Sequence, residues 1–242
     1  MNVTSIIIPT YNEKSMLKEC IHSIRKHTDV PYEIIVVDNG STDGTTKFLL
    51  QEAIPFVSNY ENRGFPAACN AGMKLSKGDT ILLLNNDVLL TPNWLSHMLS
   101  CLYHQKDVGI VGPMTNYASG SQRIQVAYTS LDDMIRKYNI EKLGTYTEVK
   151  RLIGFCFLFK REVMQKIGLL DERFSPGHYE DDDYCYRARQ AGYRLMIAED
   201  TFVFHHGSVS FGKKKEGQFQ QIVERSRSLF IEKWGVDPSS IS

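Results

Sequence analysis

Along the first half of the chain, short runs of β-branched residues alternate with longer amphipathic segments. The run at 4–8 precedes the segment 13–26, and the run at 33–37 precedes the segment 42–51. In the first segment, Met16, Leu17, Cys20, Ile21 and Ile24 recur on one helical face, and Asn12 stands where a side chain would cap the helix. This alternation predicts parallel strands joined by crossover helices that pack on the sheet, an α/β fold.

The same patterns predict the remaining elements. Strands are expected at 56–60, 80–84, 108–111, 151–159, 194–197 and 201–204. Helices are expected at 67–75, 92–103, 131–143, 161–167, 181–191 and 218–234. The polar, turn-rich stretch 116–126 and the helix after it have the character of a variable insertion that shapes a pocket.

The run of apolar residues from Leu82 to Leu90 is interrupted by Asn85, Asn86 and Asp87. A buried strand has no structural use for three polar residues in its middle. The carboxyl end of such a strand, however, is where ligands and metals bind in α/β proteins. We therefore interpret Asp87 as a metal-binding carboxylate.

Polar groups follow each of the first four predicted strands, at 9–13, 38–44, 62–64 and 85–87. In an open α/β sheet these groups form one continuous rim, which is the expected ligand crevice. The alternative for residues 38–44 is a simple turn and helix cap, because every residue type in them favours turns. That alternative loses weight because all four strands end in the same way.

Composition limits the function without identifying it. The chain has 242 residues, of which 42% are hydrophobic and 23% charged, so one domain with a full core is expected. A formal net charge of +0 gives no global reason to bind nucleic acid. The five cysteines include no Cys-x-x-Cys pair and are expected to be reduced core residues. With no signal-like or membrane-spanning segment, a cytoplasmic protein is expected, and peripheral association with the inner face of the membrane stays open.

Several ordered motifs resemble the family-2 glycosyltransferases, in their rhamnosyltransferase-like branch. They lie at 5–13, 37–45, 62–72, 84–87, 154–161, 180–183 and 205–207. The resemblance implies a GT-A fold, which is a Rossmann-like fold with a mostly parallel central sheet and helices on both faces. It also implies one domain, in which residues 1–112 bind the nucleotide sugar and residues 113–242 bind the acceptor and carry catalysis.

The resemblance also implies the nucleotide-binding residues. Pro9 and Tyr11 would line the base pocket with Glu13 nearby, and Asp38 would accept the imide N–H of uracil or thymine. Gly64 would allow the backbone to approach the nucleotide. The full set is Pro9, Thr10, Tyr11, Glu13, Asp38, Asn62, Gly64, Asn70, Asn85 and Asn86.

Asp87 matches the last residue of the family's Asp-x-Asp motif, so it would hold a divalent ion, Mn²⁺ or Mg²⁺, that bridges the two phosphates. Asn85 replaces the first aspartate of that motif and would lie near the ribose. One negative charge is lost by this replacement, which predicts a weaker metal site.

Four acidic residues at 180–183 begin a predicted helix, where the helix dipole favours carboxylates, so a capped acidic terminus is the alternative to a catalytic site. Only one or two of these side chains can face a pocket. The resemblance selects Glu180 and Asp181, with Asp181 as the general base. Clustered carboxylates raise one another's proton affinity, which suits a base. Asp183 is expected to support the helix.

His205 and His206 end a predicted strand, and adjacent strand residues point to opposite faces, so one of them is expected to face the site. Imidazole together with carboxylate suits a manganese-type ion. The resemblance selects His205 as the residue near the metal, with His206 as the alternative. Residues 213–215 are three lysines that would either close over the diphosphate or form an ordinary solvated loop.

The predicted function is that of an inverting hexosyltransferase in bacterial surface polysaccharide synthesis. It would move a sugar from a UDP- or dTDP-linked donor to a hydroxyl of a glycan, a lipid-linked glycan or a protein. The acceptor is expected beside Gly154, Phe155, His178 and Tyr179, with Phe174 nearby. The alternatives are a nucleotidyltransferase, which would normally carry glycine and a basic residue after the first strand, and a nucleotide-sugar-binding protein without catalysis.

Overall fold

The computed structural model describes residues 3–125, 130–139, 144–207 and 216–240. The first half contains β1 (Thr4–Thr10), α1 (Lys14–His27), β2 (Tyr32–Asp38), α2 (Thr45–Gln51), β3 (Phe56–Ser58), α3 (Phe65–Leu75), β4 (Thr80–Leu84), β5 (Val88–Leu89), α4 (Trp94–Tyr103) and β6 (Val108–Thr115). The second half contains η1 (Gly120–Gln122), α5 (Leu131–Tyr138), β7 (Tyr146–Val149), β8 (Cys156–Lys160), α6 (Arg161–Ile167), η2 (Glu172–Phe174), α7 (Glu180–Gln190), β9 (Arg194–His205), α9 (Glu216–Trp234) and η3 (Pro238–Ser240).

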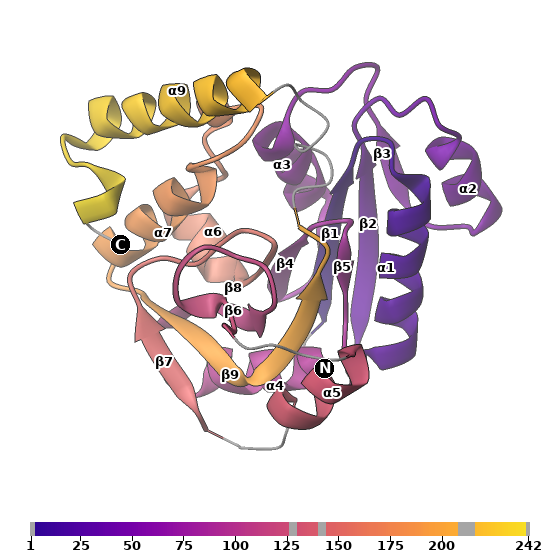
Figure 1. The fold of residues 1–242 in the computed structure, drawn as a ribbon, viewed down its shortest axis with the longest axis horizontal. Helices are drawn as coiled ribbons and strands as arrows, with labels where there is room; N and C mark the ends of the chain where they lie inside the picture. The colour runs from indigo at the N-terminus through magenta and orange to yellow at the C-terminus, as the bar shows by residue number, and fades with distance from the viewer. Residues whose placement is uncertain (1–2, 126–129, 140–143, 208–215, 241–242) are drawn as a thin grey trace.

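The described strands form one sheet in the order β3-β2-β1-β4-β8-β6-β9-β5, with β7 paired to β9 (Figure 1). The first four strands in this order are parallel, as the alternation of strands and helices predicts. β8 lies antiparallel between β4 and β6, and β9 runs parallel to β6. The parallel strands therefore bring their carboxyl ends, and the polar loops that follow them, to one edge of the sheet.

Helices cover both faces of the sheet, and successive residues of each central strand serve opposite cores (Figure 1). In β1, Ile6 and Ile8 join the core that contains residues of α1 and α4. Ile7 joins the other core, with residues of α3, α6 and α7. Because side chains alternate along a strand and all three isoleucines are fully buried, β1 is covered on both sides. This agrees with its continuous apolar sequence.

Some predicted boundaries are wrong. The strand expected at 151–159 begins only at Cys156, β7 was not predicted, and the two strands expected at 194–197 and 201–204 are one strand, β9. In β9, Ala198 pairs with Pro113 and Phe202 with Met114, so residues 199–201 bulge out while the strand continues. The helix expected at 131–143 ends at Tyr138, and residues 140–143 lie outside the described part of the chain.

Asn12 does not cap α1. Its side-chain oxygen accepts a hydrogen bond from the Thr42 backbone N–H at 2.9 Å. The first N–H of the helix, that of Lys14, instead donates to Asp43 at 2.9 Å. The loop after β2 therefore caps the helix that follows β1, and this cap joins two of the polar loops predicted to form the rim.

All five cysteines are free and buried, as expected for reduced core residues. Burial raises the pKa of each thiol, because the apolar interior disfavours the thiolate, and the pKa of Cys101 rises to about 12. Separately, no helix in the described parts of the chain combines the length and apolar character needed to cross a membrane.

Candidate active site

The interrupted strand around Asp87 brings that carboxylate against a histidine from the far end of the chain. After Leu84 the backbone turns, and the short strand β5 pairs antiparallel with the end of β9, so that Val88 lies opposite His205. Asp87 Oδ1 and His205 Nε2 are 3.3 Å apart, and both side chains are buried. The structure thus brings together Asp87 and His205, the two residues that the family resemblance implies lie near a metal ion.

The orientation of His205 is fixed by its other ring nitrogen. Nδ1 lies 2.8 Å from the backbone oxygen of Tyr117, and a carbonyl only accepts, so Nδ1 carries the proton. In the neutral ring, Nε2 therefore presents a lone pair toward Asp87. Within the described residues, neither Nε2 nor Asp87 Oδ1 has a hydrogen-bond partner. Two buried, electron-rich atoms that face each other in this way form a place for a cation.

His206 does not share this position. Its side chain is exposed, and its ring packs edge-on against Phe204 with centroids 5.1 Å apart. Only its backbone N–H reaches Asp87, donating to the carbonyl oxygen at 3.0 Å. Among the described residues, no group of three or more His, Cys, Asp or Glu side chains is placed to hold a metal. A divalent ion between Asp87 and His205 would therefore take its remaining ligands from water or a bound anion.

The turn that carries Asp87 is tied to the polar end of β1. The Asn86 side-chain amide donates to Thr10 Oγ1 at 2.9 Å, and both residues are buried. The Asn85 N–H donates to the Phe155 carbonyl at 2.9 Å, which fixes the start of the turn against the entry to β8. Pro9 is buried beside Thr10 in β1, whereas Tyr11 is 44% exposed. Of these rim residues, Tyr11 offers its side chain most openly.

Asp38 is fully buried, and both of its oxygens are used within the loop that follows β2. Oδ1 accepts from the Ser41 N–H at 3.0 Å, and Oδ2 accepts from Thr46 Oγ1 at 2.7 Å. The carboxylate thus holds the loop in shape. Glu13 follows β1 in a left-handed conformation, with a φ of 59°, at the N-cap position of α1.

Asn39, which lies in the predicted rim but was not among the predicted nucleotide-binding residues, connects two polar loops. Its buried amide donates to Asn62 at 2.9 Å and to the Gly64 carbonyl at 3.1 Å. Its oxygen accepts from the Asn59 side chain at 2.9 Å and from the Arg63 N–H at 3.2 Å. The position of Asn39 between Asp38 and Gly40 indicates a turn. Its hydrogen-bond partners, however, lie about twenty residues away, and the local pattern does not predict them.

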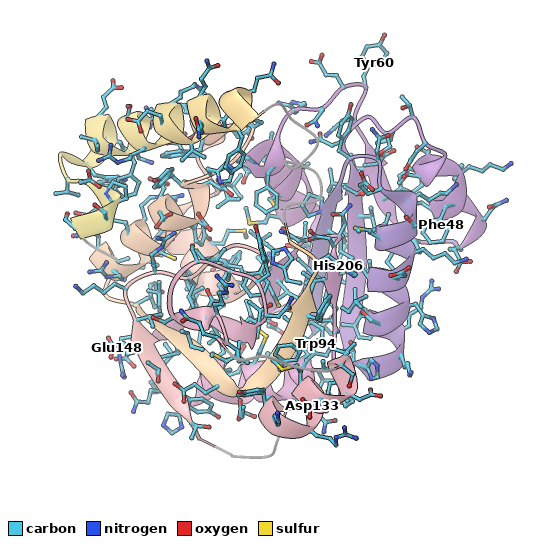
Figure 2. The ribbon with its side chains drawn as sticks, in the orientation of Figure 1. Phe48, Tyr60, Trp94, Asp133, Glu148 and His206 are labelled. Atoms are coloured by element: carbon cyan, nitrogen blue, oxygen red, sulfur yellow. The ribbon has the colours of Figure 1, made fainter. Side chains whose placement is uncertain are left out.

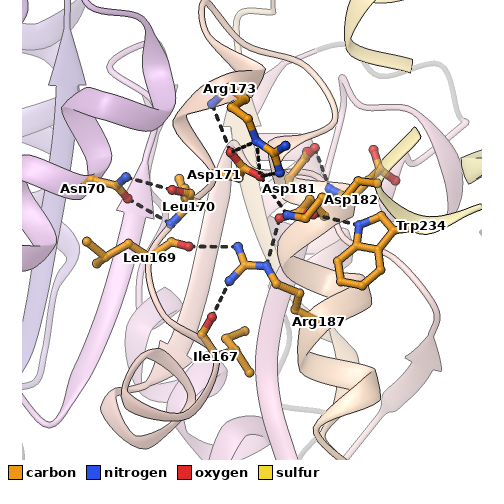
Figure 3. Close-up of polar contacts among 12 residues, drawn as sticks. Asn70, Ile167, Leu169, Leu170, Asp171, Arg173, Asp181, Asp182, Arg187 and Trp234 are labelled. Atoms are coloured by element: carbon orange, nitrogen blue, oxygen red, sulfur yellow. Dashed lines mark hydrogen bonds and ion pairs between the residues drawn. The ribbon is translucent and has the colours of Figure 1, made fainter. Parts of the chain in front are cut away.

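Gly64 and Asn70 hold the segment that leads to the acidic helix. A Cβ on Gly64, whose φ is +87°, would lie 2.8 Å from Cβ of Ser175 and 2.9 Å from Cα of Pro176. The Asn70 amide is bonded in both directions to the backbone of Leu170, each at 2.9 Å (Figure 3). The glycine is thus required by packing of the protein itself, and the asparagine, expected to bind nucleotide, is occupied by Leu170.

Asp181 lies at the start of α7 with its carboxylate held by two backbone N–H groups. Oδ2 accepts from Gly154 and Oδ1 accepts from Asp182, each at 2.9 Å. The Gly154 backbone lies close, because a Cβ there would be 3.3 Å from Cβ of Asp181. Unlike its neighbours Glu180 and Asp182, Asp181 is only partly buried. It is therefore both oriented and open to an incoming group.

The carboxyl groups on either side of Asp181 have raised proton affinity. Burial, followed by the charge of Asp181, raises the pKa of Glu180 well above its usual range. The same two causes raise the pKa of Asp182 to about 7, although the Arg151 guanidinium, 2.9 Å away, acts in the opposite direction. Burial and the neighbouring charge of Asp181 thus favour the protonated forms of Glu180 and Asp182.

Asp183 supports the structure, as expected. It is fully buried and accepts hydrogen bonds from Arg187 and from the Trp234 indole, each at 2.9 Å. Lys233 of α9 lies 2.6 Å from the same carboxylate. The Arg187 guanidinium also donates to the Ile167 and Leu169 carbonyls, which joins α7 to the end of α6.

The residues expected to bind the acceptor have mixed surroundings. Phe155 is 1% exposed and stacks on His205, with centroids 5.1 Å apart, so its ring supports the histidine and is not open to an acceptor. His178 and Tyr179 precede α7 in left-handed conformations and contact Phe219 and Phe230 of α9. Phe174 is fully buried. Residues 213–215 lie outside the described part of the chain.

Comparisons of the sequence place the chain among sugar-transferring enzymes. The profile described as Glycosyl transferase family 2 matches residues 5–168. The Glycosyltransferase GlyG of Streptococcus pneumoniae is 32% identical over 90% of this chain and 72% of its own length. An N-acetylglucosaminyl-diphospho-decaprenol L-rhamnosyltransferase of Mycobacterium tuberculosis is 24% identical over 88% of this chain and 78% of its own length. An uncharacterized protein of Sinorhizobium fredii is 29% identical, but this chain spans only 27% of its length.

Solved structures share the fold at low sequence identity. GalNAc-T7 with UDP, GalNAc and Mn²⁺ superposes with a TM-score of 0.69 at 19% identity, covering 85% of this chain and 44% of that one. Mannosyltransferase PcManGT from Pyrobaculum calidifontis, in complex with GDP-Man and Mn²⁺, gives a TM-score of 0.65 at 18% identity, covering 98% of this chain and 77% of that one. These similarities confirm the predicted fold.

Proposed function

The chain belongs to glycosyl transferase family 2, and from this premise we propose that it transfers a sugar, with inversion, from a UDP- or dTDP-linked donor to an acceptor hydroxyl. The observation that carries the proposal is the pair of buried atoms Asp87 Oδ1 and His205 Nε2, which face each other at 3.3 Å without another partner among the described residues. A carboxylate oxygen and an imidazole nitrogen are a donor set that suits Mn²⁺.

A divalent ion held by Asp87 and His205 would supply positive charge to the diphosphate that leaves with the nucleotide. The Mn²⁺ named with GalNAc-T7 and PcManGT supports this assignment. The chain's own contribution is to keep both ligands in place before anything binds. Asp87 lies in a turn that Asn86 ties to Thr10, and His205 is held by Tyr117 and Phe155.

We assign the general base to Asp181. The two N–H groups of Gly154 and Asp182 orient its carboxylate without neutralising it, and its partial exposure lets an acceptor hydroxyl approach. As the acceptor oxygen attacks the anomeric carbon on the face opposite the leaving group, Asp181 takes the hydroxyl proton. The bond to the nucleoside diphosphate breaks in the same displacement, which inverts the anomeric configuration.

On the donor side, Tyr11 is the exposed ring at the rim and is assigned to the base pocket, with Glu13 beside it. Asp38 acts on this pocket through the loop that it holds, because Ser41 and Thr46 already engage both of its oxygens. For the acceptor, Gly154, His178 and Tyr179 surround the start of α7. The rhamnosyltransferase of M. tuberculosis, whose name includes a lipid-linked sugar, supports a lipid-linked or surface glycan as the acceptor.

The first test is calorimetric titration of UDP, dTDP and GDP into the full chain, with and without Mn²⁺. We expect a uridine or thymidine diphosphate to bind more tightly with Mn²⁺, and Asp87→Ala to lose that gain. Asp132→Asn, an exposed aspartate in the first turn of α5, is the matched control. Equal binding with and without the metal would contradict the metal assignment. Failure of every diphosphate to bind would contradict the donor site. Sugar transfer to a candidate acceptor, with NMR of the product anomer, then tests inversion.

A further inference from the structure

The backbone of His205 extends beyond the strand that should pair with it. β6 ends at Thr115, which pairs with Val203, whereas β9 continues to His205. At this point the Asn116 side chain takes the place of a strand. Its Oδ1 accepts from the His205 N–H at 2.8 Å, and its Nδ2 donates to the His205 carbonyl at 3.0 Å. One amide side chain thus satisfies both backbone groups of the histidine.

The next residue, Tyr117, contacts the histidine ring itself. Its carbonyl accepts from His205 Nδ1 at 2.8 Å, and its own ring packs edge-on against the imidazole, with centroids 5.7 Å apart. The same tyrosine ring lies so close to Gly207 that a Cβ there would be 2.4 Å from it. His205 is therefore held by Tyr117 on one side and by the stacked ring of Phe155 on another.

The segment that carries Asn116 and Tyr117 is itself anchored. The Thr115 carbonyl accepts from the Ile124 N–H at 2.8 Å. The Gln122 amide donates to the Pro113 carbonyl at 3.0 Å and accepts from the Ile153 N–H at 2.7 Å. These bonds connect residues 116–122 to β6 and to the segment before Gly154. The position of His205 is thus set by a segment that the sequence pattern indicates to be a variable insertion.

The two tautomers of neutral His205 would have opposite effects on the site. With the proton on Nδ1, bound to Tyr117, the Nε2 lone pair faces Asp87 and both atoms stay available to a cation. With the proton on Nε2, the ring would donate directly to Asp87 Oδ1, 3.3 Å away, and the pair would be closed. Hydrogen bonds to the second nitrogen of a histidine are the usual means of selecting between these states.

We propose that Asn116 and Tyr117 are positioning residues that hold His205 in its Nδ1-protonated form and so keep the Asp87–His205 pair open to a divalent cation. The inference rests on the proposed function for the identity of the ion. The geometry of the histidine, however, belongs to the free protein and can be measured without metal.

The test uses the full chain with Asn116→Ala, which removes both amide bonds, and Asn116→Asp, which keeps an acceptor for the His205 N–H but loses the donor. Asn139→Ala is the matched control, because that asparagine also joins two segments through its amide, donating to the Pro92 carbonyl. Thermal unfolding identifies a variant that fails to fold. If Asn116→Ala does not fold, Asn116→Asp is the variant measured.

Two measurements are made on each protein. Long-range ¹H–¹⁵N NMR of the metal-free protein, at a pH of about 8.5 where a typical imidazole is neutral, reports which nitrogen of His205 is protonated. We expect Nδ1 in the wild-type chain and in Asn139→Ala, and a shift toward Nε2 in the Asn116 variants. Electron paramagnetic resonance of free Mn²⁺ in the presence of UDP then gives the affinity. Loss of the contact between Asn116 and His205 is expected to weaken Mn²⁺ binding about 10- to 100-fold.

The outcomes separate this inference from the proposed function. If Asp87→Ala loses Mn²⁺ but the Asn116 variants keep wild-type affinity and tautomer, the positioning role is wrong and the metal site stands. If the wild-type chain binds no Mn²⁺ but the Asn116 variants still change the tautomer, the positioning of His205 stands and the metal assignment fails. An Nε2-protonated wild-type histidine would overturn the inference directly.

Discussion

Two groups of polar residues differ in how far their hydrogen bonds are satisfied. The first, the donor loops, comprises the loops after β2 and β3 together with α3. The second, the catalytic edge, comprises Asp87, His205 and the start of α7. In the donor half, the side chain of Asp38 is hydrogen-bonded within the segment after β2, and those of Asn39 and Asn70 are bonded to other loops. At the catalytic edge, Asp87 Oδ1, His205 Nε2 and Glu180 Oε2 are buried without a hydrogen-bond partner in the described residues. The polar side chains of the first region are hydrogen-bonded within the protein, whereas three buried atoms of the second have no partner among the described residues.

The hydrogen bonds of the two regions distinguish them, whereas their amino-acid composition does not. Asp38 and Asp87 both lie at strand ends, so the sequence pattern does not tell them apart. A buried polar atom without a hydrogen-bond partner costs about 1–3 kcal/mol, so each such atom needs an explanation, and a bound ion is one explanation. The donor loops are therefore bonded within the protein, whereas Asp87 Oδ1 and His205 Nε2 leave hydrogen-bonding capacity for the ion proposed above.

Substitution of Asp181 should cause the largest loss of activity. Asp181→Asn keeps the size of the side chain but cannot accept a proton, so the rate of sugar transfer should fall about 10²- to 10⁴-fold. Nucleoside diphosphate affinity, measured by calorimetry, should stay at the wild-type value, because the change is on the acceptor side. Asp132→Asn should transfer sugar normally. Transfer within a few-fold of wild type in Asp181→Asn would remove this residue from the role of base.

Loss of the Asn39 amide should destabilise the donor loops. Asn39→Ala leaves four hydrogen-bonding groups around residues 59–64 without their partner, so the free energy of unfolding should fall by about 2–3 kcal/mol. Urea unfolding measures the loss. Gln51→Ala, on the exposed last turn of α2, should change stability by less than about 0.5 kcal/mol. Equal effects of the two substitutions would mean that the loops are not held by this amide.

The ion pairs of Lys233 should make a smaller contribution to the stability of the second half of the chain. Lys233 lies 2.8 Å from Asp171 and 2.6 Å from Asp183, with little exposure of its side chain. Lys233→Met should cost about 1–2 kcal/mol in urea unfolding, since Asp183 keeps Arg187 and Trp234 as partners. The control is Lys137→Met, whose exposed pair with Asp133 should contribute less than about 0.5 kcal/mol.

The stability of the protein should also depend on pH through the carboxyl group of Glu180. The folded protein raises the pKa of Glu180 above the ordinary value of 4.5, so it holds a proton that the unfolded chain releases. Stability from this group is therefore present at low pH and is lost as the pH rises from about 4.5 toward and beyond neutrality.

Glu180→Gln removes this loss, so the stability of the variant relative to wild type should increase steadily as the pH rises above about 4.5. Urea unfolding at a series of pH values measures the gap. Glu19→Gln, on the exposed face of α1, should show a gap that does not change with pH. A constant gap for Glu180→Gln would show that the carboxyl group is not held in its protonated form.

Much of this arrangement follows from the sequence, because apolar runs fix the strands and parallel strands bring their following loops to one edge. The pairing of Asp87 with His205 and the structural role of Asp183 were predictable from motif and helix position. The further residues that contact these side chains could not be predicted. Asn116 contacts His205 because β6 ends one residue earlier, and Gly64 is required by Ser175, 111 residues later. Such contacts depend on where chain segments meet, which no local pattern records.

The burial of the cysteines gives the protein a practical property. Thiol reagents react with the thiolate, and all five native thiols are buried with raised pKa values. A cysteine introduced in place of Tyr60, which is fully exposed on the loop after β3, should therefore be labelled alone by a maleimide dye (Figure 2). The wild-type sequence is thus already a background for fluorescence measurements of distance and motion, with no native cysteine removed.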